Sequence, residues 1–172
     1  MACNIINGIS LVDDCENNVG GVSELYLIDS ASVTATTVVE SAWTVTSIVA
    51  TEDFSTFQFR RNTASVSTEM ATDLLVGSTV YTSTINIKFS KRTASKSRAL
   101  NILGEGGRYL NGIVKTADGK YWYYENLVLS SGAETTGVAK TDGSSYDCNF
   151  IDDGASHRAY EVDSSIIQNL IS

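Results

Sequence analysis

Polar and apolar residues alternate along much of the chain, which is the pattern of strands that bury one face. Val80–Phe89 is the clearest case, because its aromatic and isoleucine side chains share one side. In Trp43–Val49 the same rule puts Val45 and Ile48 on opposite faces. The predicted strands number about ten. They cover Ser23–Ile28, Ser32–Val39, Trp43–Val49, Thr56–Arg60, Ala64–Met70, Val80–Phe89, Arg108–Thr116, Lys120–Glu125, Thr135–Lys140, Ser144–Ile151 and Ala159–Val162.

Two Asp-Gly pairs predict tight turns between these strands. Asp118-Gly119 and Asp142-Gly143 each stand between alternating segments, where a hairpin turn needs residues that accept positive φ. Ala71–Ser78 is interpreted as a link with some helical character. The chain contains no proline, so its turns depend on glycine, asparagine and aspartate.

Ser90–Leu103 is the best helix candidate within the chain, because alanine and leucine recur along one side of it. The glycine-rich segment Gly104–Gly107 is interpreted as the helix cap and a turn. Ser164–Ile171 predicts a short amphipathic helix with Asp163 or Ser164 as its N-cap. The fold class is therefore mainly β, a sandwich or partly closed barrel of antiparallel strands with one flanking α-helix and a C-terminal helical turn. We expect one domain, 1–172.

Charge and composition exclude several function classes. The net charge of −8 argues against a general nucleic-acid binder, which is expected to be basic. No apolar run is long enough to cross a bilayer, and the first residues lack the features of a secretory signal. Cys3, Cys15 and Cys148 form no paired motif, which favours free thiols in a reducing compartment.

A basic cluster lies around the predicted internal helix. It consists of Lys88, Lys91, Arg92, Lys96 and Arg98. One interpretation is the solvated face of an amphipathic helix. The other is contact with an anionic partner, either nucleic acid or an acidic face of another subunit. Because the rest of the chain is acidic, we predict that Lys91, Arg92, Lys96 and Arg98 lie at a subunit interface.

Tyr121, Trp122, Tyr123 and Tyr124 form an aromatic run that could stack on bases or sugars. Alternate residues of a strand face opposite ways, so we expect one pair in the core and the other at a surface or interface. The core interpretation is preferred. A carbohydrate-binding or host-surface-binding module that uses these aromatic side chains is kept as an alternative function.

Catalytic chemistry has no support in the sequence. His157 is the only histidine, and its neighbour Ser156 does not make a relay, because a catalytic triad depends on spatial proximity. Gly104–Gly107 follows a helix instead of opening one, so it is not a phosphate loop. Asp142 and Asp152-Asp153 lack the spacing of a calcium loop. We expect that the protein is not an enzyme. We also expect no catalytic, metal-binding or cofactor-binding residues and no cofactor.

The order of several segments resembles virion proteins of tailed phages of gut Bacteroidales, including crAss-like phages. These are proteins of the tail-tube and head–tail ring type. The resemblance rests on RNTASVSTEM, VYTSTINIKFSKRTASKSRALNIL, IVKTADGKYWYY and the ending AYEVDSSIIQNLIS, together with CENNVGGVSELYLID near the start.

The resemblance implies two packed antiparallel sheets with a flanking helix, and a virion protein assembled in the host cytoplasm. It implies a homo-oligomeric ring, hexameric for a tail tube or dodecameric for some connectors. Such rings stack with other tail or connector proteins, and DNA passes through the lumen without specific binding. A head–tail connector ring or a tail terminator is the alternative within this family.

Overall fold

The computed structural model describes residues 20–152 and 154–171, and within them the chain is mainly β, which confirms the predicted class. The strands are β1 (Val22–Asp29), β2 (Val33–Val39), β3 (Thr44–Ala50), β4 (Ser55–Gln58), β5 (Ala64–Asp73), β6 (Ser78–Ser90), β7 (Leu110–Thr116), β8 (Tyr121–Thr135), β9 (Ser145–Asp152) and β10 (Tyr160–Val162). The helices are α1 (Ala94–Gly104) and α2 (Ser164–Ile167), with 3-10 turns at Ser30–Ser32 and Glu105–Gly107.

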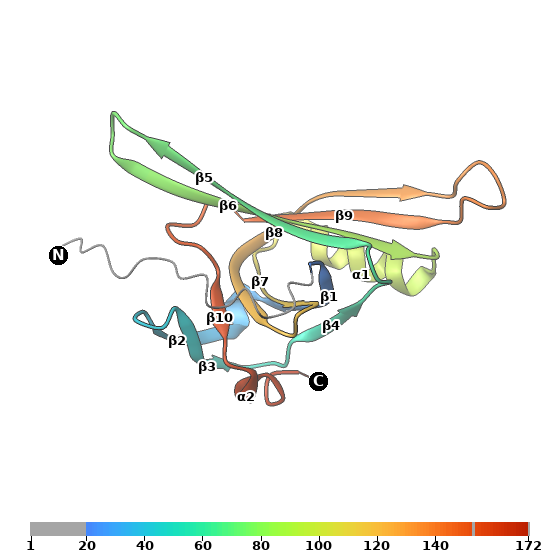
Figure 1. Ribbon diagram of the computed structural model, residues 1–172. Helices are drawn as coiled ribbons and strands as arrows, with labels where there is room; N and C mark the ends of the chain where they lie inside the picture. The colour runs from blue at the N-terminus through green and yellow to red at the C-terminus, as the bar shows by residue number, and fades with distance from the viewer. Residues whose placement is uncertain (1–19, 153, 172) are drawn as a thin grey trace.

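The long strand β8 joins two layers of one hydrogen-bonded sheet. Its first half lies between β10 and β7 in the order β2-β3-β10-β8-β7-β1-β4. From Leu127 onward it pairs with β9, which continues to β6 and β5. We call β5, β6, β9 and the second half of β8 the upper layer, which crosses the top of Figure 1, and the other strands the lower layer.

Two apolar clusters form the core. One fills the space between the layers, where Leu25 of β1 meets Ile85 and Phe150 of the upper layer and Leu103 of α1. The other lies on the opposite face of β1 and β7, against side chains of β3, β10 and α2. β1 is therefore buried on both faces from Leu25 to Ile28, which explains why these four residues are a continuous apolar run without alternation.

The predicted faces of β3 are wrong. Val45 and Ile48 were expected on opposite faces, yet both are buried in the second cluster. The register of β3 against β2 shifts at Thr46, which has no partner in the pairing. A β-bulge of this kind adds one residue and restarts the alternation, so both apolar side chains turn inward.

The predicted start of the internal helix is also wrong. Ser90 is the last residue of β6, and α1 begins at Ala94. Thr93 is the N-cap, and its hydroxyl accepts a hydrogen bond from the Lys96 N–H at 3.3 Å. Beyond the other end, Gly106 has φ 68°, a left-handed conformation that agrees with the predicted cap and turn.

Two strands are longer than predicted. β5 continues to Asp73, so the expected link Ala71–Ser78 is the end of a hairpin. β8 runs unbroken through Thr135, so the predicted strand Thr135–Lys140 is wrong, and Asp142-Gly143 lies in a wide loop between β8 and β9. Asp118-Gly119 does form a tight turn, between β7 and β8. The two long hairpins project from opposite ends of the upper layer (Figure 1).

Candidate functional site

The outer edge of β5 has no strand partner among the described residues, since β5 pairs only with β6. The Lys88 N–H donates to the Thr63 carbonyl at 2.8 Å, just before β5 begins. Paired and outward-facing positions alternate in an antiparallel ladder, so the even-numbered residues of β5 turn their N–H and C=O groups outward. These residues are Ala64, Val66, Thr68, Met70 and Thr72.

The opposite edge of the upper layer belongs to the second half of β8. Ser130–Thr135 is exposed, and within the part of the chain that the structure describes it pairs only with β9. α1 lies beside this edge, and between them runs a groove of about 870 Å³ lined by Arg98, Leu100, Ile102 and Leu129. We call it the α1 groove. It combines apolar side chains, a cation and a free strand edge.

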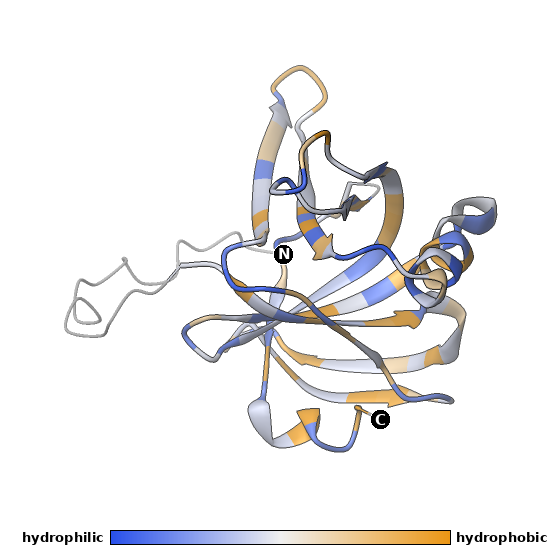
Figure 2. Cartoon of the chain, turned by 90° about the vertical axis from the view of Figure 1, so that its right-hand side faces the viewer, coloured by the Kyte–Doolittle hydropathy of each residue, from blue (hydrophilic) through white to orange (hydrophobic). Residues whose placement is uncertain are grey.

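The hairpin of β5 and β6 extends beyond the other strands as an arm with an apolar tip (Figure 1). Leu74, Leu75 and Val76 are 90%, 98% and 76% exposed, and Figure 2 shows the hydrophobic colour at this tip, at the top of the molecule. The Asp73 carboxylate accepts hydrogen bonds from the N–H groups of Leu75 and Val76, at 2.8 and 3.3 Å. The turn is therefore held in one conformation while it presents its apolar side chains to solvent.

The four predicted interface residues lie at or near the start of α1, and two of them already have partners within the chain. Arg92 forms an ion pair with Glu134 of β8. The Lys96 ammonium donates to a backbone carbonyl at the end of β6 at 2.5 Å. Lys91 and Arg98 are exposed, and Arg98 lines the α1 groove. The structure therefore leaves Lys91 and Arg98 as the better candidates for contact with another subunit.

The outer face of the upper layer is polar. Ser65 and Ser67 of β5 and Asn86 of β6 alternate with residues whose side chains face the core. Lys88 and Asp147 form an ion pair on neighbouring strands at 3.7 Å. This face thus offers small hydroxyl and amide groups, with charges of both signs close together.

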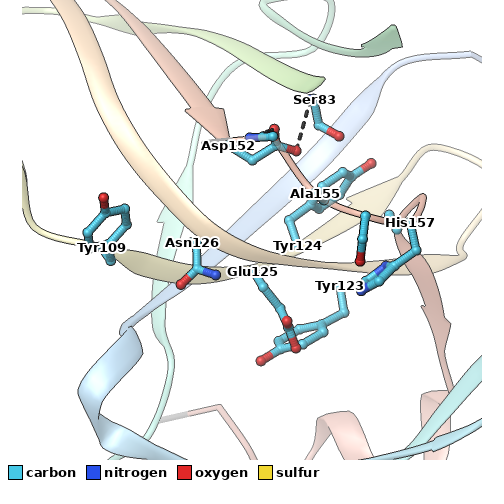
Figure 3. A pocket seen from close by; sticks show the side chains of 12 residues that line it. Ser83, Tyr109, Tyr123, Tyr124, Glu125, Asn126, Asp152, Ala155 and His157 are labelled. Carbon is cyan, nitrogen blue, oxygen red and sulfur yellow. Dashed lines mark hydrogen bonds between the residues drawn. The ribbon is translucent and has the colours of Figure 1, made fainter. Parts of the chain in front are cut away.

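A separate candidate site is a notch beside β8, at the point where the pairing of this strand changes from β10 to β9. Tyr123 pairs with Tyr160 of β10, and Leu127 pairs with Asp152 of β9, so the strand between them borders an opening. The cavity there measures about 550 Å³ (Figure 3). Its wall includes Glu125, a residue of the unpaired stretch.

Asp152, in the wall of the notch, has a carboxylate that is held by two backbone hydrogen bonds. Its carboxylate accepts from the Ser83 N–H at 2.9 Å and from the Gly154 N–H at 3.2 Å, so it ties β9 to the arm and to the following loop. Burial, with Asp152 nearby, raises the pKa of Tyr124 to about 12. The phenol therefore stays protonated and remains a hydrogen-bond donor at neutral pH.

The aromatic run does not form an exposed stacking platform. Tyr123 and Tyr124 are both buried, and Tyr121 and Trp122 are half-buried, because β8 is covered on both faces. The Asn111 amide donates to the Tyr123 hydroxyl at 2.9 Å, and burial raises the pKa of Tyr123 to about 12. The preferred core interpretation is right, but the expectation of an outward-facing pair is wrong.

Among residues 20–152 and 154–171, no group of three His, Cys, Asp or Glu side chains could hold a metal ion. His157 directs Nδ1 at the Arg158 carbonyl, 2.9 Å away, and makes no relay with Ser156. Cys148 is a buried free thiol whose pKa burial raises to about 11. Cys3 and Cys15 lie outside the described residues.

Sequence reasoning missed two features of these surfaces. The first is the apolar tip of the arm. The run Leu74-Leu75-Val76 could have indicated it, because three adjacent apolar residues next to a glycine suit an exposed turn poorly. The notch had no local signal, since its wall joins residues from β6, β8, β9 and the loop before β10, together with Tyr109, which precedes β7.

Comparison with known proteins finds no matching family model and no matching curated protein. Within the described part of the chain, no helix has the length and apolar character needed to span a membrane.

Proposed function

We propose that this chain is the subunit of a phage tail tube and self-assembles into stacked rings around a DNA-conducting channel. The observation that carries the proposal is the pair of free strand edges on opposite sides of the upper layer. Soluble proteins that act alone usually shorten, cover or charge such edges. Here β5 offers an edge along its whole length, and β8 offers the matching one.

The strand directions suit closure into a ring. β5, β6, β9 and β8 are successively antiparallel, so β5 and β8 run in opposite directions. Rotation about a ring axis that lies along the strands preserves each direction, so β5 of one copy meets β8 of the next as an antiparallel pair. Strand addition of this kind joins the upper layers into a continuous antiparallel barrel in which the upper layer has no remaining edge.

Charge favours the same contact. Between Asn62 and Ile87 the chain contains Glu69 and Asp73 but no lysine or arginine. The α1 groove, where β5 of the neighbour is received, has Arg98, Glu105 and Glu134 in its wall, and Glu134 is already paired with Arg92. Lys91, which precedes α1, is a further exposed cation nearby. Opposite charges on the two contacting surfaces steer association and disfavour wrong pairings.

The choice of a tail tube over another ring protein depends on the motif resemblance described above. In the proposed ring the polar outer face of the upper layer lines the channel. Hydroxyl and amide groups there, without a basic patch, let the DNA backbone slide with little binding. A head–tail connector ring or tail terminator is the alternative, and it would use the same two edges.

Electron microscopy and sedimentation velocity of the purified full chain over a range of concentrations test the proposal. We expect closed rings, hexameric for a tube, that stack into tubes as concentration rises. Rings that never stack, above all dodecamers, favour a connector. A chain that remains monomeric at every concentration overturns the proposal.

A further inference from the structure

The notch at the β8 bend is lined by hydrogen-bonding groups from separate parts of the chain. Figure 3 shows Tyr109 and Asn126 at one end, His157 at the other, and Asp152 above the strand. The cavity of about 550 Å³ lies within the range of small-ligand sites, roughly 300–1,000 Å³. Proposed ring contacts do not involve this opening, so its role is a separate question.

The wall that carries His157 is rigid. The His157 ring packs on Tyr160 with centroids 4.5 Å apart and meets Trp43 edge-on at 6.3 Å. The Trp43 indole N–H donates to the Ala159 carbonyl at 3.0 Å. Trp43 itself has φ 54°, which is uncommon for a large side chain and is retained only where the surroundings impose it.

This packing also fixes the chemistry of the imidazole. The carbonyl of Arg158 is an acceptor only, so Nδ1 of His157 carries a proton and donates to it. In the neutral ring Nε2 is then a hydrogen-bond acceptor. Glu125 adds an exposed carboxylate on the same cavity. The notch therefore presents acceptors at Nε2 and Glu125, with the amide of Asn126 supplying both donors and an acceptor.

These groups select one ligand class. No lysine or arginine lines the notch, which disfavours phosphates and other anions. The carboxylate of Asp152 already accepts two backbone N–H groups, which weakens its attraction for a cation. A purely apolar ligand would leave the polar wall unpaired. A sugar ring is uncharged and carries hydroxyl groups that both donate and accept hydrogen bonds, which matches the polar groups of this wall.

We propose that the notch between β9 and β10 is a binding site for one sugar ring of a glycan. The hydroxyl groups of the sugar donate to Nε2 of His157 and to the Glu125 carboxylate. This moves the glycan-binding function considered for the aromatic run to a different part of the chain.

Ligand-observed NMR on the full chain tests the site. The probes are the methyl glycosides of glucose, galactose, mannose and N-acetylglucosamine, with tetramethylammonium as a cationic probe. Glu125→Gln keeps the shape of the side chain and removes its charge. His157→Phe keeps the ring packing on Tyr160 and removes Nε2. Glu52→Gln, at an exposed carboxylate that does not line the notch, is the matched control.

We expect saturation transfer to at least one glycoside, with Kd roughly tenfold weaker in Glu125→Gln and in His157→Phe and unchanged in the Glu52 control. The absence of saturation transfer to all four glycosides overturns the proposal. Binding that both notch variants retain also overturns it. Tetramethylammonium binding without glycoside binding also overturns it, in favour of a cation site. Binding is measured on rings and on monomers separately, so failure of assembly and failure of sugar binding are distinguished.

Discussion

Thr68→Pro is the sharpest test of the proposed ring contact. Thr68 is the middle one of the five outward-facing positions of β5, so its N–H is available to a neighbouring strand and unnecessary for pairing with β6. Proline removes that N–H and is tolerated at an edge position of this kind. The substitution also removes the hydrogen bond between the Thr68 and Ser83 hydroxyls, which are 3.0 Å apart.

Thr68→Val is the matched control, because it loses the same hydroxyl and keeps the N–H. The lost hydroxyl bond costs the folded chain about 0.5–1.5 kcal/mol in both variants. Only proline leaves a carbonyl of the neighbouring β8 unpaired at a buried contact, which costs about 1–3 kcal/mol. The dissociation constant of each contact should therefore rise roughly 5- to 150-fold in the proline variant relative to the valine variant.

Sedimentation velocity at matched concentrations measures the assembled fraction, and circular dichroism with thermal melting checks that both variants fold. We expect Thr68→Val to assemble nearly as the unmodified chain does and Thr68→Pro to remain mostly monomeric. If a folded Thr68→Pro assembles at the same concentration as Thr68→Val, the β5 edge is not a ring contact and the reasoning is refuted.

Three further predictions concern other parts of these surfaces. Leu75→Ser at the arm tip should weaken stacking of rings about 10- to 150-fold, because burying a leucine contributes roughly 1.5–3 kcal/mol, and electron microscopy of tube length measures it. Arg98→Glu should weaken ring formation, because it adds a carboxylate beside Glu105 and Glu134 where β5 of the neighbour is received, and native mass spectrometry can follow this. Tyr123→Phe should lower the free energy of unfolding by about 1–3 kcal/mol in urea titrations, because the Asn111 amide loses its acceptor.

The first of these has a control variant, and each of the three has a contradicting outcome. Val49→Ser removes an exposed apolar side chain from β3, far from the arm, and should leave tube length unchanged. Full-length tubes with Leu75→Ser would show that the tip makes no stacking contact. Ring formation that is unchanged in Arg98→Glu would show that Arg98 makes no ring contact. An unfolding free energy unchanged within about 0.5 kcal/mol in Tyr123→Phe would contradict the buried hydrogen bond.

Local chemistry alone predicted the mainly β class, the strand Val80–Phe89, the Asp118-Gly119 turn and the helix that follows β6. These features depend on neighbours two to four positions apart, which a sequence displays directly. The predicted boundaries of the helices and strands were less accurate. α1 begins at Ala94 because Ser90 is still paired in the sheet, a contact with β9 that no local pattern reveals.

The surfaces that carry the proposals were decided by tertiary structure. β8 is continuous because it pairs with β7 and β10 first and with β9 afterwards. Its aromatic run enters the core on both sides because the two apolar clusters cover both faces of its first half. The same change of partner opens the notch at Glu125. The bulge at Thr46 likewise depends on β2. The sequence determined which segments are strands, but which strands pair, and therefore which edges and openings remain, depends on contacts between distant residues.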